Sequence, residues 1–275
     1  MTLGIDLGGT NLCLGLVENG IVKERISVPS FEPSATLDET LEYLAEQIAK
    51  VLTPQITKIG TGVPTVVDVH RGIVYEAANI PSWTEVHLKE FLEGRFGLPV
   101  SVNNDANCYA MGAYGKYPED AKPESLVAMT LGTGLGIGIV DNGRLICGVN
   151  CGAGELGYLG YNGGCLEEFC SKQFFAKYNA DSYELSLAAQ AGDPEALKIF
   201  KEFGRHLGYA VSIVMFAYDP SHVVFGGGIA NALPLFKDSI MEYLRENFPL
   251  SKSVDRLVID AQTSIDTPIL GASLI

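Results

Sequence analysis

A carboxylate stands near the end of the first apolar run of the chain, directly before a turn rich in glycine. The run covers residues 3–7 and contains Asp6. Glycine has no Cβ, so backbone N–H groups in such a turn can converge on an anion. Asp6 would then act on a metal ion held by that anion, although an ordinary hairpin turn fits the same residues. The residues of the turn are Gly8, Gly9, Thr10 and Asn11.

The same pattern returns in the second half of the chain. An apolar run at residues 125–131 leads into a second glycine turn, and each turn is followed by a strand-like segment and an Asn-Gly pair. Asn-Gly between apolar runs predicts a tight hairpin, because a type I′ turn needs positive φ at both central positions. We therefore expect two similar halves, each directing a glycine turn at a shared cleft that clamps a polyphosphate. The repeated residues are Gly132, Thr133 and Gly134 in the turn, with Asn19-Gly20 and Asn142-Gly143 in the hairpins.

Polar residues cluster where a predicted strand at residues 98–102 gives way to a helix. Four of the five residues at 103–107 are Asn or Asp, and Asp105 is the carboxylate among them. Ligands bind at the carboxyl ends of strands in open α/β sheets. Helix capping explains one such polar residue but not four, so we interpret the cluster as a site. A third strand-to-glycine turn contains Gly226, Gly227 and Gly228.

Two glutamates occupy positions that core packing does not explain. Glu155 lies among the glycines of residues 152–157, where the backbone must approach something closely. Glu167 stands at the start of a predicted helix, whose positive end favours a carboxylate. Phosphoryl transfer to a hydroxyl fits this set of groups. In that reaction the glycine turns hold a nucleotide, Asp6 orients Mg²⁺ and Asp105 takes the proton of the attacking hydroxyl.

The composition excludes several classes of function. The chain has 275 residues, 47% of them hydrophobic, which suffices for one large domain or two of ordinary size. Its net charge of −14 argues against a nucleic-acid surface, so a bound phosphate must be held by backbone amides, helix dipoles and a metal. The sequence contains no apolar span of membrane length, and a strand-like segment at its start leads us to expect no signal peptide. We expect a cytoplasmic protein with no membrane or nucleic-acid partner.

Alternating strands and helices must position these groups. An amphipathic helix at 35–52, followed by a strand at 58–63 that contains Gly62, is typical of an α/β fold. Trp83 closes an irregular region, and we interpret it as a packing anchor rather than a ligand platform. The other expected elements are short strands at 72–75, 223–225 and 257–259, and helices at 84–97, after 103–107 up to 115, over 183–219 and at 271–275.

Taken together, these motifs resemble the ROK family (repressor, open reading frame, kinase), in the family's order and over essentially the whole chain. The resemblance implies the α/β, actin-like or ribonuclease-H-like fold that sugar kinases share with acetate kinase and Hsp70. It also implies a cleft between a smaller domain, at 1–109 plus 265–275, and a larger one at 110–264. The matching segments are Asp6–Thr10, Asn104–Asn107, Leu131–Gly136, Gly152–Gly157, Gly164–Glu167, Gly226–Gly228 and Leu270–Ala272.

The resemblance further implies an ATP-dependent hexose kinase and assigns roles to residues. Asp105 corresponds to the catalytic base, and Asp6 is expected to hold Mg²⁺ through water. Regulators of the family begin with a winged helix for DNA, whereas this chain begins at the first glycine-turn strand, so we expect a kinase. The implied sugar contacts are Asn104, Asp105, Glu155, Glu167 and the backbone around Gly62. The implied nucleotide contacts are Gly8, Gly9, Thr10, Asn11, Gly132, Thr133, Gly134, Gly226, Gly227 and Gly228.

The chain departs from the family pattern between the two glutamates. Tyr158 stands where the family has a His that contacts the sugar, so Tyr158 is expected to line the sugar site and to alter the pocket. The family's longer loop carries zinc ligands, of which only Cys165 remains here, and we expect no structural zinc. We expect the six cysteines to be free thiols. They are Cys13, Cys108, Cys147, Cys151, Cys165 and Cys170.

Three classes of function stay open on the sequence. The favoured one is phosphorylation of the 6-hydroxyl of glucose or a close relative, with an N-acylhexosamine, fructose or allose as alternative substrates. The second is a non-catalytic sugar-binding or regulatory protein, which the missing zinc loop would favour. The third is an actin-like or Hsp70-like ATPase, against which Glu155 and Glu167 argue because carboxylates suit a polyhydroxylated ligand. The expected partners are a hexose, ATP and ADP, with a homodimer left open.

Overall fold

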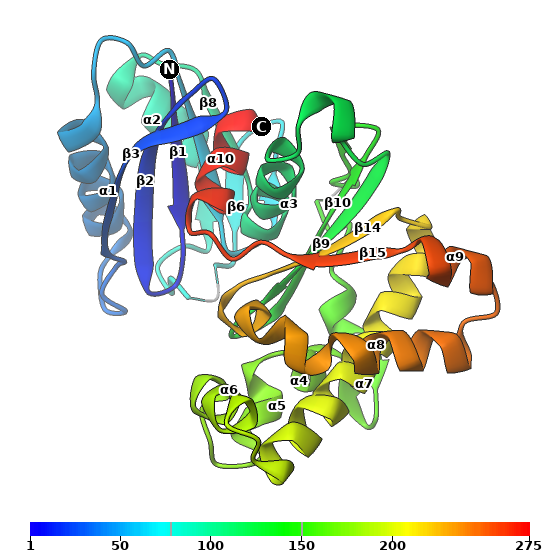
Figure 1. The fold of residues 1–275 in the computed structure, drawn as a ribbon. Helices are drawn as coiled ribbons and strands as arrows, with labels where there is room; N and C mark the ends of the chain where they lie inside the picture. The colour runs from blue at the N-terminus through cyan, green and yellow to red at the C-terminus, as the bar shows by residue number, and fades with distance from the viewer. Residues whose placement is uncertain (78, 150) are drawn as a thin grey trace. The chain divides into compact units, whose positions relative to one another are not determined.

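The computed structural model describes residues 1–77, 79–149 and 151–275. Contacts between residues divide the chain into two compact units. Each unit is α/β, with helices around its own five-stranded sheet (Figure 1). The first unit contains Met1–Lys122, Leu145–Ala153 and Ser264–Ile275, and the second contains Pro123–Arg144 and Gly154–Thr263.

The sheet of the first unit consists of β1 (Thr2–Leu7), β2 (Asn11–Glu18), β3 (Ile21–Pro29), β4 (Lys58–Val63) and β8 (Val100–Asn104). Their order across the sheet is β3-β2-β1-β4-β8. β1 is antiparallel to β2 and parallel to β4, and β4 is parallel to β8. The carboxyl ends of β1, β4 and β8 therefore meet at one edge of this sheet.

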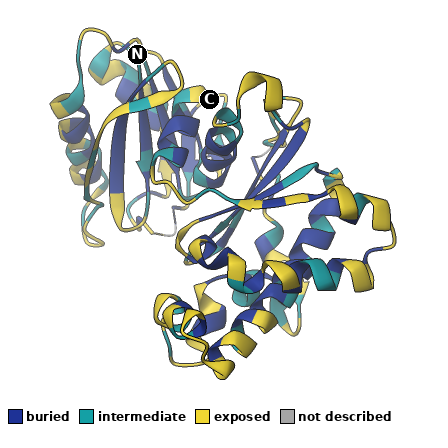
Figure 2. Ribbon diagram, in the orientation of Figure 1, coloured by how far each residue is buried: buried dark blue, intermediate teal, exposed yellow. Residues whose placement is uncertain are grey.

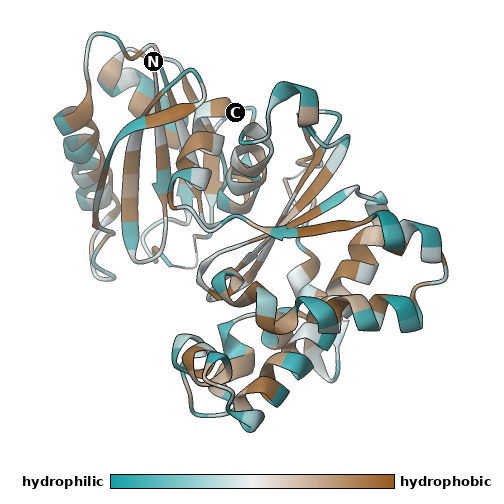
Figure 3. Cartoon of the chain, viewed as in Figure 1, coloured by the Kyte–Doolittle hydropathy of each residue, from teal (hydrophilic) through white to brown (hydrophobic). Residues whose placement is uncertain are grey.

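The second unit repeats this arrangement with β9 (Ser125–Leu131), β10 (Leu135–Asp141), β11 (Arg144–Leu145), β14 (His222–Gly226) and β15 (Val258–Ala261). Their order is β11-β10-β9-β14-β15, with β9 antiparallel to β10 and parallel to β14. β9 and β10 are buried over most of their length (Figure 2), and apolar residues follow the central strands (Figure 3). The repeated strand pattern expected from the sequence is confirmed.

Both Asn-Gly hairpins form where the sequence places them. Asn19 and Gly20 have φ angles of 52° and 75°, and Asn142 and Gly143 have φ angles of 47° and 74°. Positive φ at both central positions is the requirement of a type I′ turn. The turns join β2 to β3 and β10 to β11.

The helices of the first unit are α1 (Leu37–Val51), α2 (Leu88–Phe96), α3 (Asp105–Gly115) and α10 (Asp266–Leu274), with a 3₁₀ turn at Glu119–Ala121. Beside them lies a small sheet of β5 (Val67–Asp68), β6 (Ile73–Tyr75) and β7 (Glu85–Val86).

Two expected boundaries in this unit are corrected. The helix expected from residue 84 begins at Leu88, because Glu85 and Val86 pair with β6 instead. The strand expected from residue 98 begins at Val100, because Gly97 ends α2 with a φ of 65° and Pro99 lacks an N–H group. Helix capping places the start of α1 correctly, since Thr36 and Glu39 form a capping box.

The second unit contains η2 (Leu156–Tyr158), α4 (Glu167–Cys170), α5 (Lys172–Ala176), α6 (Ser182–Gln190), α7 (Pro194–Tyr218), η3 (Gly228–Ala232), α8 (Leu233–Asn247) and α9 (Ser251–Arg256). A two-stranded ribbon joins β12 (Gly160–Tyr161) to β13 (Gly164–Cys165). The single helical stretch expected over 183–219 is wrong. Gly192, with a φ of 91°, ends the first helix, and Asp193 caps a new one that has Pro194 in its first turn.

The C-terminal helix α10 packs backbone to backbone within the first unit. A Cβ on Gly271 would lie 1.5 Å from the carbonyl oxygen of Cys108, and one on Gly112 would lie 1.8 Å from that of Thr267. Both contacts join α10 to α3, which lie side by side in Figure 1. Glycine is required at these positions because any side chain would separate the two helices. The sequence-based domain boundary at residue 109 falls inside α3.

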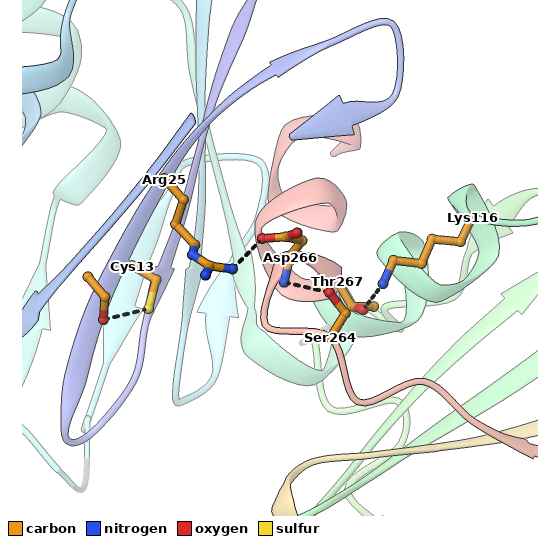
Figure 4. A network of polar contacts seen from close by, with 7 residues as sticks. Cys13, Arg25, Lys116, Ser264, Asp266 and Thr267 are labelled. Carbon is orange, nitrogen blue, oxygen red and sulfur yellow. Dashed lines mark hydrogen bonds and ion pairs between the residues drawn. The ribbon is translucent and has the colours of Figure 1, made fainter. Parts of the chain in front are cut away.

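Polar contacts fix the start of α10 to the same unit (Figure 4). Arg25 of β3 forms an ion pair of 2.7 Å with Asp266, and Lys116, which caps α3, donates to the hydroxyl of Thr267. Side chains from two elements distant in the sequence therefore hold the first turn of α10.

Trp83 is a packing anchor, as expected from the sequence. Its side chain is 1% exposed, and its Nε1–H donates to Thr40 Oγ1 at 2.7 Å. The ring also lies 5.6 Å from that of Phe31. Trp83 thus connects the irregular segment to α1. Over the described residues, no helix combines the length and the apolar character needed to cross a membrane.

The packing of α10 makes a stability prediction. Gly271→Ala should lower the free energy of unfolding by about 3 kcal/mol or more, because a Cβ would collide with the Cys108 carbonyl. The matched control is Gly94→Ala in α2, where nothing lies within 4 Å of the Cβ position. That change should raise stability by about 0.5–1 kcal/mol, as expected for Gly→Ala inside a helix. Urea unfolding measures both, and equal stability of the two variants would contradict the close packing.

Candidate functional site

The strand register of the first unit places two predicted site residues, Asp6 and Gly62, in one row with Asn103. Asp6 of β1 is opposite Gly62 of β4, and Gly62 is opposite Asn103 of β8. A Cβ on Gly62 would lie 3.1 Å from Cys108 Sγ and 3.5 Å from Asp105 Cα. The absence of a side chain at Gly62 thus lets the first turn of α3 approach the end of β4.

Asp105 is the first residue of α3, directly after β8. Asn104 caps the helix: its side-chain oxygen accepts from the N–H groups of Ala106 at 2.9 Å and Asn107 at 3.2 Å. Its Nδ2 donates to the carbonyl of Thr65 at 3.3 Å. The N–H of Ala106 also donates to Asp105 Oδ1 at 2.7 Å. The helix end therefore stabilises a carboxylate at this position.

Asp6 and Asp105 lie close enough to influence each other's charge. Burial and, to a smaller extent, the negative charge of Asp105 together raise the pKa of Asp6 to about 7. Burial also raises the pKa of the neighbouring Cys108 thiol well above its usual value, with smaller contributions from both carboxylates. A sheltered pair of like charges favours a proton or a cation between them.

Asn103 and Asn107 form a buried amide pair beside these carboxylates. Asn107 is 1% exposed, and its Nδ2 donates to Asn103 Oδ1 at 3.0 Å. The same oxygen accepts from the backbone N–H of Asn104 at 2.8 Å. Asn107 Oδ1 has no hydrogen-bond partner among the described residues. The density of polar residues at 103–107 signalled this pair, but the sequence gave neither residue a role of its own.

In the second unit Glu167 is tied to the second glycine turn. Its Oε2 accepts from the backbone N–H of Leu135 at 2.9 Å, and its Oε1 accepts from Gln173 Nε2 at 3.3 Å. A Cβ on Gly134 would lie 2.4 Å from Glu167 Oε2. Burial raises the pKa of Glu155, and Glu167 raises it further, so the two predicted carboxylates lie near one another. Gln173 was not anticipated from the sequence.

The glycine turns differ in why they need glycine. Gly227 has a φ of 80°, and a Cβ there would lie 2.3 Å from the Leu131 carbonyl oxygen. By contrast, no atom lies within 4 Å of the Cβ positions of Gly132 and Gly228. In the first turn, Cβ atoms would lie 3.1 Å from Asn11 O at Gly8 and 3.0 Å from Asn79 Nδ2 at Gly9. The open space at Gly132 and Gly228 can admit a ligand against the backbone.

A cavity of about 410 Å³ adjoins the third glycine turn within the second unit. This volume lies in the range of small-molecule pockets. The sequence did not predict it, because its walls come from α6, the start of α5 and η3. Its lining includes Lys172, Asp181, Tyr183, Gln190, Gly228 and Asn231.

Several other predicted residues face solvent. Thr10, Asn11 and Thr133 are exposed, and Tyr158 is 75% exposed. All six cysteines are free, as expected, and four of them are buried. Within the described ranges, no group of three or more His, Cys, Asp or Glu side chains is placed to hold a metal ion.

Comparison with known proteins identifies the family. The ROK family model matches residues 2–275. The glucokinase of Streptomyces coelicolor is 32% identical, and the match covers 100% of this chain and 93% of that protein. The N-acetyl-D-glucosamine kinase of Aliivibrio salmonicida is 27% identical, with 94% of each chain covered.

A solved structure shows the same fold. The ROK family glucokinase of Streptomyces griseus, in complex with glucose and AMPPNP, is 26% identical and superposes with a TM-score of 0.80. The match covers 99% of this chain and 97% of that one. The predicted actin-like, ribonuclease-H-like α/β fold with a duplicated sheet is thereby confirmed. On the family match and these relatives, the chain belongs to the ROK family.

Proposed function

We propose that this protein transfers the γ-phosphoryl group of ATP to a hexose, most favourably to the 6-hydroxyl of glucose or a close relative. The observation that carries the proposal is the sheltered carboxylate pair, Asp6 and Asp105, at the carboxyl edge of the first sheet. Phosphoryl transfer to an alcohol needs a base for the hydroxyl proton and groups that hold the phosphates. Sugar kinases among the relatives support the reaction class.

Asp105 is the proposed general base. Its carboxylate accepts the proton of the attacking sugar hydroxyl, and the charge of the ionised form is stabilised by the Ala106 N–H at the start of α3. Asn104 holds the helix end through its two capping hydrogen bonds. The base is thus oriented by the junction of β8 and α3 before any substrate binds.

Asp6 is the residue we assign to Mg²⁺, through water. Its sheltered carboxylate, with a pKa raised to about 7 by burial and by Asp105, fits a divalent cation because the cation would offset the unfavourable negative charge. When bound, Mg²⁺ would neutralise charge on the phosphate oxygens. Asp6 itself lies at the end of a buried strand, which fixes its position.

The sugar contacts we propose come from polar groups that suit hydroxyls. In the first unit they are Asn104, Asp105 and the backbone at Gly62. In the second unit they are Glu155 and Glu167, with Tyr158 on the exposed turn that follows Glu155. Carboxylates accept hydrogen bonds from sugar hydroxyls.

The nucleotide contacts we propose are the three glycine turns. The open Cβ positions of Gly132 and Gly228 support backbone contact with a ligand. The cavity beside Gly228 would take the base, an assignment supported by its size and by polar walls that include Lys172 and Asn231. The full set is Gly8, Gly9, Thr10, Asn11, Gly132, Thr133, Gly134, Gly226, Gly227 and Gly228.

A second substrate class has its own support. Kinases of N-acetyl-D-glucosamine are among the relatives. Tyr158 also stands where the resemblance to the family implies a His that contacts the sugar. The first experiment therefore measures ADP release from ATP and Mg²⁺ with glucose, mannose, fructose, allose, N-acetylglucosamine and N-acetylmannosamine. Parallel arms contain EDTA or a zinc-selective chelator. Sugar-dependent turnover that EDTA abolishes and the zinc chelator spares is the expected result, whereas sugar binding without turnover would favour a regulatory protein.

Replacement of the base separates chemistry from binding. Asp105→Asn should lower kcat by about 10²–10⁴-fold, the range for a lost general base, while calorimetry still detects sugar binding. Asp120→Asn, which changes an exposed carboxylate of the same unit, is the matched control and should leave kcat unchanged. Unchanged turnover in Asp105→Asn would remove Asp105 from the role of base.

Adjacent glycines of the third turn test nucleotide contact. Gly228→Ala should fold with near wild-type stability and raise the KM for ATP by about 10-fold, because its Cβ would enter open space used by the nucleotide. Gly227→Ala should instead lower the unfolding free energy by about 1–3 kcal/mol, since its Cβ would meet the Leu131 carbonyl. Thermal unfolding and steady-state kinetics measure both. An unchanged KM for ATP in Gly228→Ala would contradict close approach of the nucleotide.

A further inference from the structure

The chain between Glu155 and Glu167 folds back on itself as a short ribbon. Gly160 pairs with Cys165 and Tyr161 with Gly164, and the N–H of Leu166 donates to the Leu159 carbonyl at 2.9 Å. The intervening turn is Asn162-Gly163, with φ angles of 49° and 84°. This return brings the two ends of the segment, and hence the two carboxylates, near one another.

Such a ribbon needs support from outside. Its strands have two residues each, and an isolated two-stranded hairpin is marginal in water even when longer. The end that carries Glu167 has its own support, because Leu135 and Gln173 both donate to that carboxylate. At the other end, Gly154 and Gly157 pack on β10, where Cβ atoms would lie 2.1 Å from the Ile137 carbonyl oxygen and 3.0 Å from the Leu135 carbonyl oxygen. The turn between these two glycines carries Glu155 and leads directly into the ribbon.

The anchor is the side chain of Tyr161. Its ring stacks on Tyr209 of α7 with centroids 4.6 Å apart and planes at 22°. The ring is also edge-on to Phe169 of α4 at 5.1 Å and to the His206 ring at 5.6 Å. Its hydroxyl lies 2.9 Å from Nδ1 of His206, also on α7. Lys177 lies 3.7 Å above the Phe169 ring and closes the cluster.

His206 is suited to accept from that hydroxyl. Burial lowers its pKa, Glu202 at 3.7 Å opposes this, and Lys177 lowers it further. A neutral imidazole keeps one ring nitrogen free of a proton, so Nδ1 can accept while Nε2–H faces Glu202. The hydrogen bond therefore adds direction to the ring stacking.

We infer that Tyr161 and His206 are positioning residues for sugar binding: they fix the ribbon on α7 and thereby set Glu155 against Glu167. The inference rests on the proposed function, in which these carboxylates bind sugar hydroxyls. Loss of the anchor should weaken sugar binding, because Glu155 then samples several positions. Binding of ATP should change little, since the glycine turns and their cavity do not depend on the ribbon.

Three variants test the anchor with little change in volume. Tyr161→Phe removes the hydroxyl and keeps the ring. His206→Leu removes the acceptor. His206→Asn provides an acceptor again, because Asn Oδ1 is bonded to Cγ as His Nδ1 is. We expect Tyr161→Phe and His206→Leu to raise the KM and Kd for the best sugar about 3- to 10-fold, with KM for ATP and kcat within about 2-fold. His206→Asn should lie nearer to wild type.

The control removes a comparable hydrogen bond elsewhere. Tyr43→Phe removes the hydrogen bond of 2.9 Å from the Tyr43 hydroxyl to the Pro29 carbonyl in the first unit, and it should leave the sugar KM unchanged.

A double-mutant cycle tests whether Tyr161 acts through Glu155. If Tyr161 acts through Glu155, then Tyr161→Phe should have no further effect on sugar Kd in a Glu155→Gln background.

The outcomes separate this inference from the proposed function. If the wild-type protein phosphorylates a sugar but Tyr161→Phe and His206→Leu leave the KM for that sugar unchanged, the inference alone is overturned. Equal losses of affinity for sugar and ATP in the variants, or a change only in their folded fraction, would also overturn it. If the wild-type protein binds a sugar but does not phosphorylate it, the kinase proposal is overturned. The sugar Kd values of the variants would then still test whether Tyr161 and His206 position Glu155. Neither binding nor turnover with any sugar would overturn both.

Discussion

The close approach of α10 to α3 is the contact on which the first unit depends. Carbonyl oxygens of Cys108 and Thr267 occupy the spaces where side chains of Gly271 and Gly112 would lie. α10 also packs on β1 and β4, where Cβ atoms at Gly4 and Gly60 would lie 2.1 and 1.7 Å from its carbonyl oxygens. β1 and β4 carry Asp6 and Gly62 near their carboxyl ends, and α3 begins at Asp105. The last helix of the chain therefore fixes the relative positions of the carboxylates that the proposed reaction uses.

The electrostatics of that edge explain why the packing must be firm. A carboxylate whose pKa is raised to about 7 by burial is unfavourable in its ionised form, and a second carboxylate nearby adds to the cost. Such an arrangement persists only where the surrounding structure over-determines it. Backbone contacts without side chains and the cap at Asn104 supply that constraint. A group with a raised pKa held in place in this way is typical of functional sites.

The two units use one sheet topology for different purposes. In the first, carboxylates stand at the strand ends beside one glycine turn, and in the second the strand ends carry two glycine turns, with open space at Gly132 and Gly228. The carboxylates of the second unit lie instead on the turn and helix that follow the sheet. Glu167 joins these features, because it contacts the Leu135 N–H of the glycine turn and stands beside Glu155. A repeated scaffold has thus acquired distinct groups through its loops.

The sequence by itself determined the features that depend on near neighbours. Asn-Gly pairs specified both type I′ hairpins, the apolar period and capping box specified α1, and motif order specified the family. Only the tertiary structure decided the features that depend on distant contacts. Glu85 and Val86 pair with β6, so α2 begins later than the sequence suggested. Glycine is needed at 227 and 134 because a Cβ there would meet Leu131 and Glu167. The buried Asn107 acceptor, the cavity at the third turn and the Tyr161 anchor also remained hidden. Each is formed by segments far apart in the chain, and the local sequence pattern does not indicate which of these segments come into contact.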